Sequence, residues 1–239
     1  SVTHELKSPI ASLKLYLQTL SRRTVTDEQR AGFYRFMLED VERLDTLINH
    51  TLDAARLDQQ PVETDMVDVE LSSVLRSCAE MLCLRYHLPV ETVRLDLAPA
   101  ILRARTIDIE MVFRNLIDNA IKYGGADPVV EVESRMVDDA TVVTRIIDNG
   151  RGIPPNLRRK VFGRFVRLGH ELERSQSGTG LGLFIVRTLV TRLHGKISVR
   201  DRGNHTGTVF EGQLPARRAE EHQPADDSMP AADAEDAFR

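Results

Sequence analysis

Apolar residues recur at alternating intervals of four and three residues near the N-terminus, and this spacing limits what the chain can fold into. In the first segment these residues are Leu6, Ile10, Leu13, Leu17 and Leu20. A second segment, up to about residue 57, repeats the spacing with Met37, Val41, Leu44 and Ile48, widened by Leu47 and Leu52. Such seams are typical of helices that pack side by side, as in coiled coils.

A short polar turn separates the two predicted helices. Thr26 and Gln29 have the spacing of a capping box, which predicts the start of the second helix. Two helices joined by a short turn form a helical hairpin. One hairpin alone buries two apolar stripes poorly, whereas two copies would bury them in a four-helix bundle. We therefore expect residues 1–60 to form a dimerisation hairpin and the protein to be a homodimer.

The pattern changes after the polar stretch DQQPVETD, which predicts a domain boundary near residue 61. Helices are predicted over residues 71–86, 107–123 and 180–195, the last one ended by Gly195. Strands are predicted over residues 90–97, 101–104, 129–137, 140–149, 196–201 and 208–215. Helices and antiparallel strands mix without a regular βαβ repeat, so the chain is predicted to be α+β, with an α/β sandwich over residues 61–215.

The distribution of charge excludes one class of function. Residues 216–239 hold seven acidic and three basic side chains, and they account for the whole net charge of −4. Their richness in Ala, Asp, Glu and Pro predicts an acidic disordered tail. Acidic and basic side chains balance in the rest of the chain, so no nucleic-acid partner is predicted. No apolar run approaches the ~18–20 residues that span a bilayer, so no membrane contact is predicted for this fragment.

The helix predicted over residues 107–123 carries polar side chains along one face. Asn115 and Asn119 are four residues apart, and Lys122 follows three residues after Asn119. Amide oxygens can bind Mg²⁺, which otherwise keeps water and phosphate ligands. A lysine beside them can neutralise a phosphate. Taken alone, the stretch also fits an ordinary exposed polar face.

Two glycine-rich stretches follow. Asp148 ends a predicted strand just before Gly150 and Gly152, and its carboxylate can accept a hydrogen bond from an amine such as that of adenine. Glycines let the backbone approach a flat ring closely. The second stretch leads into a helix and consists of Gly178, Thr179, Gly180, Leu181 and Gly182. Backbone N–H groups at the start of a helix favour phosphate, although the stretch matches neither GxGxxG nor the P-loop pattern.

Taken together and in this order, these stretches resemble the catalytic core of the sensor histidine kinases of two-component signalling. The resemblance covers residues 1 to about 215. The matching segments are the H box (His4, Glu5, Leu6 and Pro9), the N box (115–123), the first glycine box (148–152), the F box (Phe162 and Phe165), the second glycine box (178–183) and the last glycine box (Gly207 and Thr208).

The resemblance implies an ATP-binding domain of the gyrase, heat-shock chaperone and histidine kinase type, with ATP and Mg²⁺ as its ligands. In such a domain Asn119 is the main Mg²⁺ ligand and Asn115 assists it. Lys122 would contact phosphate, Tyr123 would lie beside the adenine ring and Asp148 would bind the adenine amine. Residues 153–177 would form a mobile lid. The other nucleotide-binding positions would be Gly150, Gly152, Phe162, Phe165, Gly178, Thr179, Gly180, Leu181, Gly182 and Thr208.

The resemblance also implies the reaction. His4 would take the phosphoryl group of ATP, with Glu5 holding the other ring N–H, and would pass it to an aspartate on the receiver domain of a response regulator. His4 lies two residues before Leu6, about 200° around a helix, and would therefore point away from the apolar seam. The chain is expected to be the cytoplasmic part of a membrane-anchored sensor.

Ser8 follows His4 by one helical turn. Many relatives carry Thr or Asn there, where the side chain positions water to hydrolyse the phosphorylated receiver. Serine has the hydroxyl but lacks the methyl group that fixes the rotamer of threonine. A role for Ser8 in dephosphorylation and a solvated serine without such a role fit equally well.

Two other functions fit parts of the sequence. A gyrase-like ATPase would need a catalytic carboxylate in the N-box helix, but Asp118 does not share the helical angle of Asn119, and the hairpin with His4 would have no purpose. A scaffold that binds nucleotide or receiver without turnover would not need Asn119, Asp148 and the glycines together. The histidine kinase is therefore the preferred hypothesis.

Overall fold

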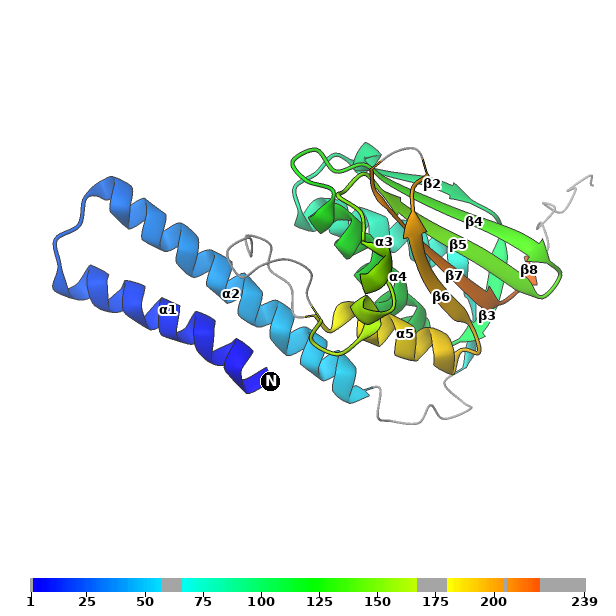
Figure 1. The fold of residues 1–239 in the computed structure, drawn as a ribbon, viewed down its shortest axis with the longest axis horizontal. Helices are drawn as coiled ribbons and strands as arrows, with labels where there is room; N and C mark the ends of the chain where they lie inside the picture. Colours follow the sequence, from blue (N-terminus) through cyan, green and yellow to red (C-terminus); the bar gives the residue numbers. More distant parts are fainter. Residues whose placement is uncertain (1, 57–65, 167–179, 204–205, 220–239) are drawn as a thin grey trace, which may run out of the picture.

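The computed structural model describes residues 2–56, 66–166, 180–203 and 206–219 of the 239-residue chain. A hairpin of two long helices extends from an α/β domain, in which helices lie against one face of a mixed sheet (Figure 1). The predicted order of a helical hairpin followed by an α+β domain is therefore confirmed.

The hairpin consists of α1 (Val2–Arg22) and α2 (Asp27–Arg56). The predicted capping box is present at the start of α2. The N–H of Gln29 donates to Oγ1 of Thr26 at 3.2 Å, and the N–H of Thr26 donates to Oε1 of Gln29 at 3.1 Å. These bonds satisfy backbone groups that have no partner within the helix, and acidic residues in the first turn favour the same end.

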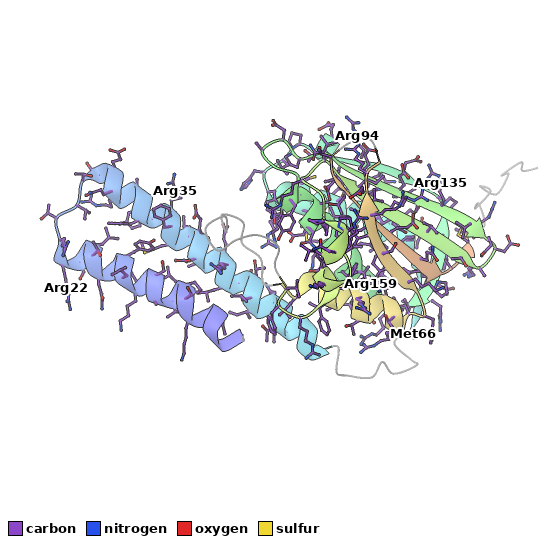
Figure 2. All side chains as sticks on the ribbon, in the orientation of Figure 1. Arg22, Arg35, Met66, Arg94, Arg135 and Arg159 are labelled. Atoms are coloured by element: carbon purple, nitrogen blue, oxygen red, sulfur yellow. The ribbon has the colours of Figure 1, made fainter. Side chains whose placement is uncertain are left out.

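Aromatic rings join the two helices of the hairpin. Tyr16 on α1 stacks on Phe33 and Phe36 of α2, with ring centroids 5.4 and 5.9 Å apart. Of the predicted seam, Leu47 is fully buried. Five seam residues are at least half exposed: Ile10, Leu17, Val41, Ile48 and Leu52. Figure 2 shows side chains projecting along the outer sides of both helices. A single copy therefore leaves an apolar stripe along the hairpin.

The main sheet has five strands in the order β2–β4–β5–β7–β6. The strands are β2 (Val93–Leu97), β4 (Val130–Asp138), β5 (Thr141–Asp148), β6 (Lys196–Asp201) and β7 (Thr208–Pro215). The helices of this domain are α3 (Leu71–Arg85), α4 (Thr106–Tyr123) and α5 (Gly182–Arg192). Short 3₁₀ helices lie at Val90–Thr92, Pro155–Leu157 and Lys160–Phe162.

One pair of strands departs from the predicted antiparallel arrangement. Strands β2 and β4 are parallel, whereas β4, β5, β7 and β6 pair antiparallel. The reason is the connection between them, because α4 lies between β2 and β4 in the sequence and a crossover of this kind joins parallel strands. Apolar side chains of α4 and α5, such as Phe113, Ile117 and Ile185, form the core together with Ile146 of the sheet.

A second, three-stranded sheet has the order β1–β3–β8. Its strands are β1 (Val67–Glu70), β3 (Ala100–Ala104) and β8 (Arg217–Arg218). Neither β1 nor β8 is predicted from the sequence, since four and two residues are too few for a recognisable pattern. Strand β8 follows residue 215, within the predicted tail, and Arg217 pairs with Asp68 at 2.9 Å. Residues 220–239 of that tail lie outside the described residues.

The end of α5 differs in detail from the prediction. The N–H of Gly195 donates to the carbonyl of Val190 at 2.8 Å, and the N–H of His194 donates to that of Thr191 at 3.0 Å, which is a Schellman arrangement. The left-handed residue is His194, with φ of 58°, rather than Gly195. Glycine is needed at position 195 because a Cβ there would collide with the carbonyl oxygen of Gln213 on β7.

Candidate functional site

A buried carboxylate at the end of β5 forms the centre of the site. Asp148 is 2% exposed, and its Oδ1 accepts hydrogen bonds from the backbone N–H groups of Gly150 at 2.8 Å and Thr208 at 3.0 Å. Burial raises the pKa of Asp148, while these hydrogen bonds and the charge of Arg202 oppose the rise. The carboxylate is thus fixed in place and desolvated, which suits it to accept a hydrogen bond from an amine of a ligand.

Glycines bring other segments against this carboxylate. A Cβ on Gly150 would collide with the carbonyl oxygen of Tyr123, at the end of α4, and a Cβ on Gly207 would collide with the carbonyl of Asp148. Gly152 and Gly207 also have positive φ, at 77° and 139°, where side chains are strained. The first glycine box therefore meets the end of the N-box helix, and the last glycine box meets the first, because these positions lack side chains.

The N box lies on α4, and its first asparagine contacts the start of α5. Asn115 is 4% exposed, and its Nδ2 donates to the carbonyl of Met111 at 2.7 Å. A Cβ on Gly182 would lie 2.7 Å from Oδ1 of Asn115, so glycine allows α5 to begin against this amide. Asn119 is half-buried one turn later on α4.

A buried carboxylate that the sequence analysis did not assign to the nucleotide site holds Lys122. Nζ of Lys122 lies 2.5 Å from Oδ2 of Asp118, and the hydroxyl of Tyr86 donates to Oδ1 of Asp118 at 2.6 Å. Burial and the charge of Asp118 raise the pKa of Tyr86, so its hydroxyl stays protonated at neutral pH. Both oxygens of Asp118 are therefore occupied by these partners.

The F box contributes one buried ring and one backbone contact. Phe162 is 6% exposed and packs edge-on against Phe210, with ring centroids 6.4 Å apart. Phe165 has a positive φ of 60°, and its N–H donates to the carbonyl of Gly180 at 2.9 Å. Gly180 also has a positive φ, and a Cβ on it would lie 2.7 Å from the backbone of Phe165. The F box and the second glycine box are therefore bound to each other.

Cation–π contact adds to this connection. The guanidinium of Arg164 lies over the ring of Phe184 on α5, 4.5 Å from its centroid. Leu181 is buried directly before α5, and its carbonyl accepts the N–H of Ile185 at 2.9 Å. Contacts with Arg164 and with Asn115 therefore hold the start of α5 in place.

Several predicted positions cannot be compared with the structure. Gly178, Thr179 and residues 167–177 of the predicted lid lie outside the described residues. His4 and Glu5 lie at the start of α1. The predicted direction of the His4 side chain lies outside what the structure describes. Ser8 follows in α1 and is exposed. In Figure 1 this end of α1 lies on the side of the hairpin nearer the α/β domain.

The end of β5, the end of α4 and the start of β7 meet at Asp148, while the start of α5 lies against Asn115, further back along α4. The carboxylate of Asp148 can hold an adenine ring through its amine, and the start of α5, which contacts α4 at Asn115, favours phosphate. In the parts of the chain that the structure describes, no three His, Cys, Asp or Glu side chains gather as metal ligands. The amide oxygens of Asn115 and Asn119, which the resemblance names as Mg²⁺ ligands, are of the chemical type that Mg²⁺ accepts.

Among the described helices, none combines the length and the apolar character needed to cross a membrane.

Two family models match the chain. The model described as "Histidine kinase-, DNA gyrase B-, and HSP90-like ATPase" matches residues 104–218. The model described as "His Kinase A (phospho-acceptor) domain" matches residues 1–60. The first model contains the site around Asp148, and the second contains the hairpin.

Curated relatives resemble almost the whole chain. It is 28% identical to the sensor histidine kinase TmoS of Ectopseudomonas mendocina over 97% of its own length and 24% of that protein. It is 30% identical to the signal transduction histidine-protein kinase/phosphatase MprB of Mycolicibacterium paratuberculosis, over 97% of its own length and 44% of that protein. The chain therefore spans less than half the length of these relatives.

A solved structure has a similar fold. The histidine kinase ThkA, in complex with the response regulator protein TrrA, matches with a TM-score of 0.68 over 90% of this chain and 59% of that chain. The sequence identity is 21%, so this likeness concerns the fold alone.

Proposed function

Because the chain belongs to the sensor histidine kinases of two-component systems, we propose that it transfers the γ-phosphoryl group of ATP to His4 and then to an aspartate of a response-regulator receiver domain. The relatives are named as sensor or signal transduction kinases, which also favours a cytoplasmic kinase region within a sensor protein. The enzyme is a protein-histidine kinase in this proposal, and its substrates are ATP and its own histidine.

One observation carries the proposal. Boxes that are far apart in the sequence contact one another: the first and last glycine boxes meet at the buried carboxylate of Asp148 beside the end of α4, and the second glycine box contacts Asn115 of the N box and Phe165 of the F box. In the proposed complex the carboxylate of Asp148 accepts a hydrogen bond from the adenine amine, and Tyr123 lies beside the adenine ring. The N-terminus of α5 faces the phosphates, and Lys122 neutralises part of their charge. Mg²⁺ held by Asn119, with Asn115 assisting, would offset further phosphate charge.

The transfer step uses groups of the hairpin. An unprotonated ring nitrogen of neutral His4 attacks the γ-phosphorus, the bond to the β,γ-bridging oxygen breaks and ADP leaves. Glu5 accepts a hydrogen bond from the other ring N–H, which selects the tautomer and stabilises the positive charge that develops. The phosphoryl group then passes to a carboxylate of the receiver. ThkA, whose fold is similar, is a histidine kinase seen with a response regulator, which supports this class of partner.

The proposal includes a homodimer. A second hairpin would cover the exposed apolar stripe on α1 and α2 and complete a four-helix bundle. The stripe is exposed in the single copy, so association would remove its apolar surface from water.

Incubation of the purified chain with γ-labelled ATP and Mg²⁺ tests the proposed activity. Label should appear on the protein and then move to a receiver domain when one is added. Labelled free phosphate without labelled protein would instead favour a gyrase-like ATPase. Bound nucleotide with neither product would favour a scaffold without turnover.

A further inference from the structure

The hydrogen-bonded group of Tyr86, Asp118 and Lys122 contains one member that no motif of the family accounts for. Tyr86 follows α3 directly, 32 residues before Asp118 on α4. The side chains of Asp118 and Lys122 are 13% and 17% exposed, so this ion pair is largely shielded from water. Tyr86 itself is half-buried.

The geometry divides the carboxylate between its two partners. Tyr86 donates to Oδ1 at 2.6 Å, and Lys122 donates to Oδ2 at 2.5 Å. The hydroxyl therefore fixes the rotation of the carboxylate and shares its negative charge. Because Lys122 contacts only the other oxygen in this arrangement, the rotation of the carboxylate determines where its ammonium group lies.

We propose that Tyr86 is a positioning residue, which acts through Asp118 to place the ammonium group of Lys122 for the phosphates of the bound nucleotide. This inference rests on the proposed function, in which Lys122 contacts phosphate. Without the hydroxyl, both oxygens of Asp118 are free to turn toward the ammonium and hold it away from a phosphate. Tyr86 does not itself touch the nucleotide.

The variant Tyr86→Phe removes the hydroxyl and keeps the ring. Binding of ATP and of adenosine is measured by competition with a fluorescent adenine nucleotide, in the full chain with Mg²⁺. ATP should bind ~3- to 10-fold more weakly, the range expected for the net contribution of an ordinary hydrogen bond, because Tyr86 acts on the phosphates only through Asp118 and Lys122. The affinity for adenosine should not change, because adenosine has no phosphate for Lys122 to contact.

A double-mutant cycle separates positioning from a general effect on the fold. In the background Lys122→Ala, the further change Tyr86→Phe should leave ATP affinity unchanged, since the residue through which it acts is gone. Tyr34→Phe is the matched control, because it removes an exposed hydroxyl on α2 and should leave both affinities unchanged. Thermal unfolding establishes that each variant is folded.

The outcomes are distinct. Equal weakening for ATP and adenosine, or a loss that persists in the Lys122→Ala background, would overturn the positioning role. So would ATP affinity of Tyr86→Phe equal to that of the wild type. A wild-type chain that binds no ATP would overturn the proposed function itself and this inference with it.

Discussion

At the scale of single residues, the environment of Asp148 accounts for the proposed recognition of adenine. A buried carboxylate is costly unless it is hydrogen-bonded, and here backbone N–H groups of Gly150 and Thr208 donate to one oxygen. A ligand amine can add a further hydrogen bond to the carboxylate. Selectivity for adenine then follows, because an ionised carboxylate accepts hydrogen bonds but donates none, and adenine presents an amine donor to it.

The substitution Asp148→Asn tests this selectivity. An asparagine keeps an oxygen for the two backbone N–H groups but presents an amide N–H₂ to the base. Donor would then face donor at the adenine amine, and ATP should bind ~10- to 100-fold more weakly. The affinity for inosine triphosphate, whose base carries an oxygen at that position, should fall much less. Titration of the variant with both nucleotides measures the difference, and equal losses for the two would contradict it.

The same variant gives a prediction for stability. Burial raises the pKa of Asp148, so the folded chain holds this proton more tightly than the unfolded chain does. The contribution of Asp148 to stability is then greatest below the carboxyl pKa of the unfolded chain, about 3.9, and is lost as pH rises through the folded-state pKa. Because asparagine does not titrate, Asp148→Asn should gain stability relative to the wild type between acid and neutral pH.

Urea unfolding of the wild type and Asp148→Asn, at about pH 4 and about pH 7, measures this gain. A difference in unfolding free energy that stays constant or shrinks with pH would show that hydrogen bonds outweigh burial at this carboxylate.

At the scale of elements, close approach between backbones holds the site together. The end of α4 meets the turn after β5 at Gly150, and the start of α5 meets α4 at Gly182. These contacts leave no room for a side chain, so the glycines bring the elements together. Their role in packing is separate from any role in binding nucleotide.

Gly150→Ala should therefore destabilise the domain even without nucleotide. Its Cβ would collide with the backbone carbonyl of Tyr123, which cannot yield without moving α4, and overpacking of this kind costs ~1–3 kcal/mol. Gly32→Ala on α2 is the matched control, because no atom lies within 4 Å of its new Cβ and alanine favours helix by ~0.5–1 kcal/mol. Urea unfolding compares them; an undiminished stability for Gly150→Ala would contradict the packing role.

At the scale of the whole molecule, local signals were predictable and distant contacts were not. The capping box of Thr26 and Gln29 and the place of Asp148 at the end of a strand depend on neighbours in the sequence, and both could be predicted. Tyr86 and Asp118 lie 32 residues apart, and no spacing rule connects them. Strand β8, which consists of Arg217 and Arg218, pairs with β3. Two arginines have no strand pattern of their own, so this strand could not be predicted from the sequence.

The hairpin adds a prediction about assembly. Ile48 is 50% exposed on α2, within the apolar stripe, and Ile48→Glu would place a charge in the proposed four-helix bundle. The wild type should sediment as a dimer, and Ile48→Glu should be largely monomeric at the same concentration. Val137→Glu is the matched control, because Val137 is 60% exposed on β4, outside the hairpin, and this variant should remain dimeric. A monomeric wild type in analytical ultracentrifugation would contradict the bundle.

Comparison of the wild type with His4→Gln tests most directly whether His4 accepts the phosphoryl group. Both chains are incubated with γ-labelled ATP and Mg²⁺, and nucleotide binding is measured on each to show that the ATP site is intact. Phosphorylation of His4 should place label that is labile in acid and stable in base on the wild type, and none on His4→Gln. Label of the same kind on His4→Gln, or none on a wild type that binds ATP, would contradict it.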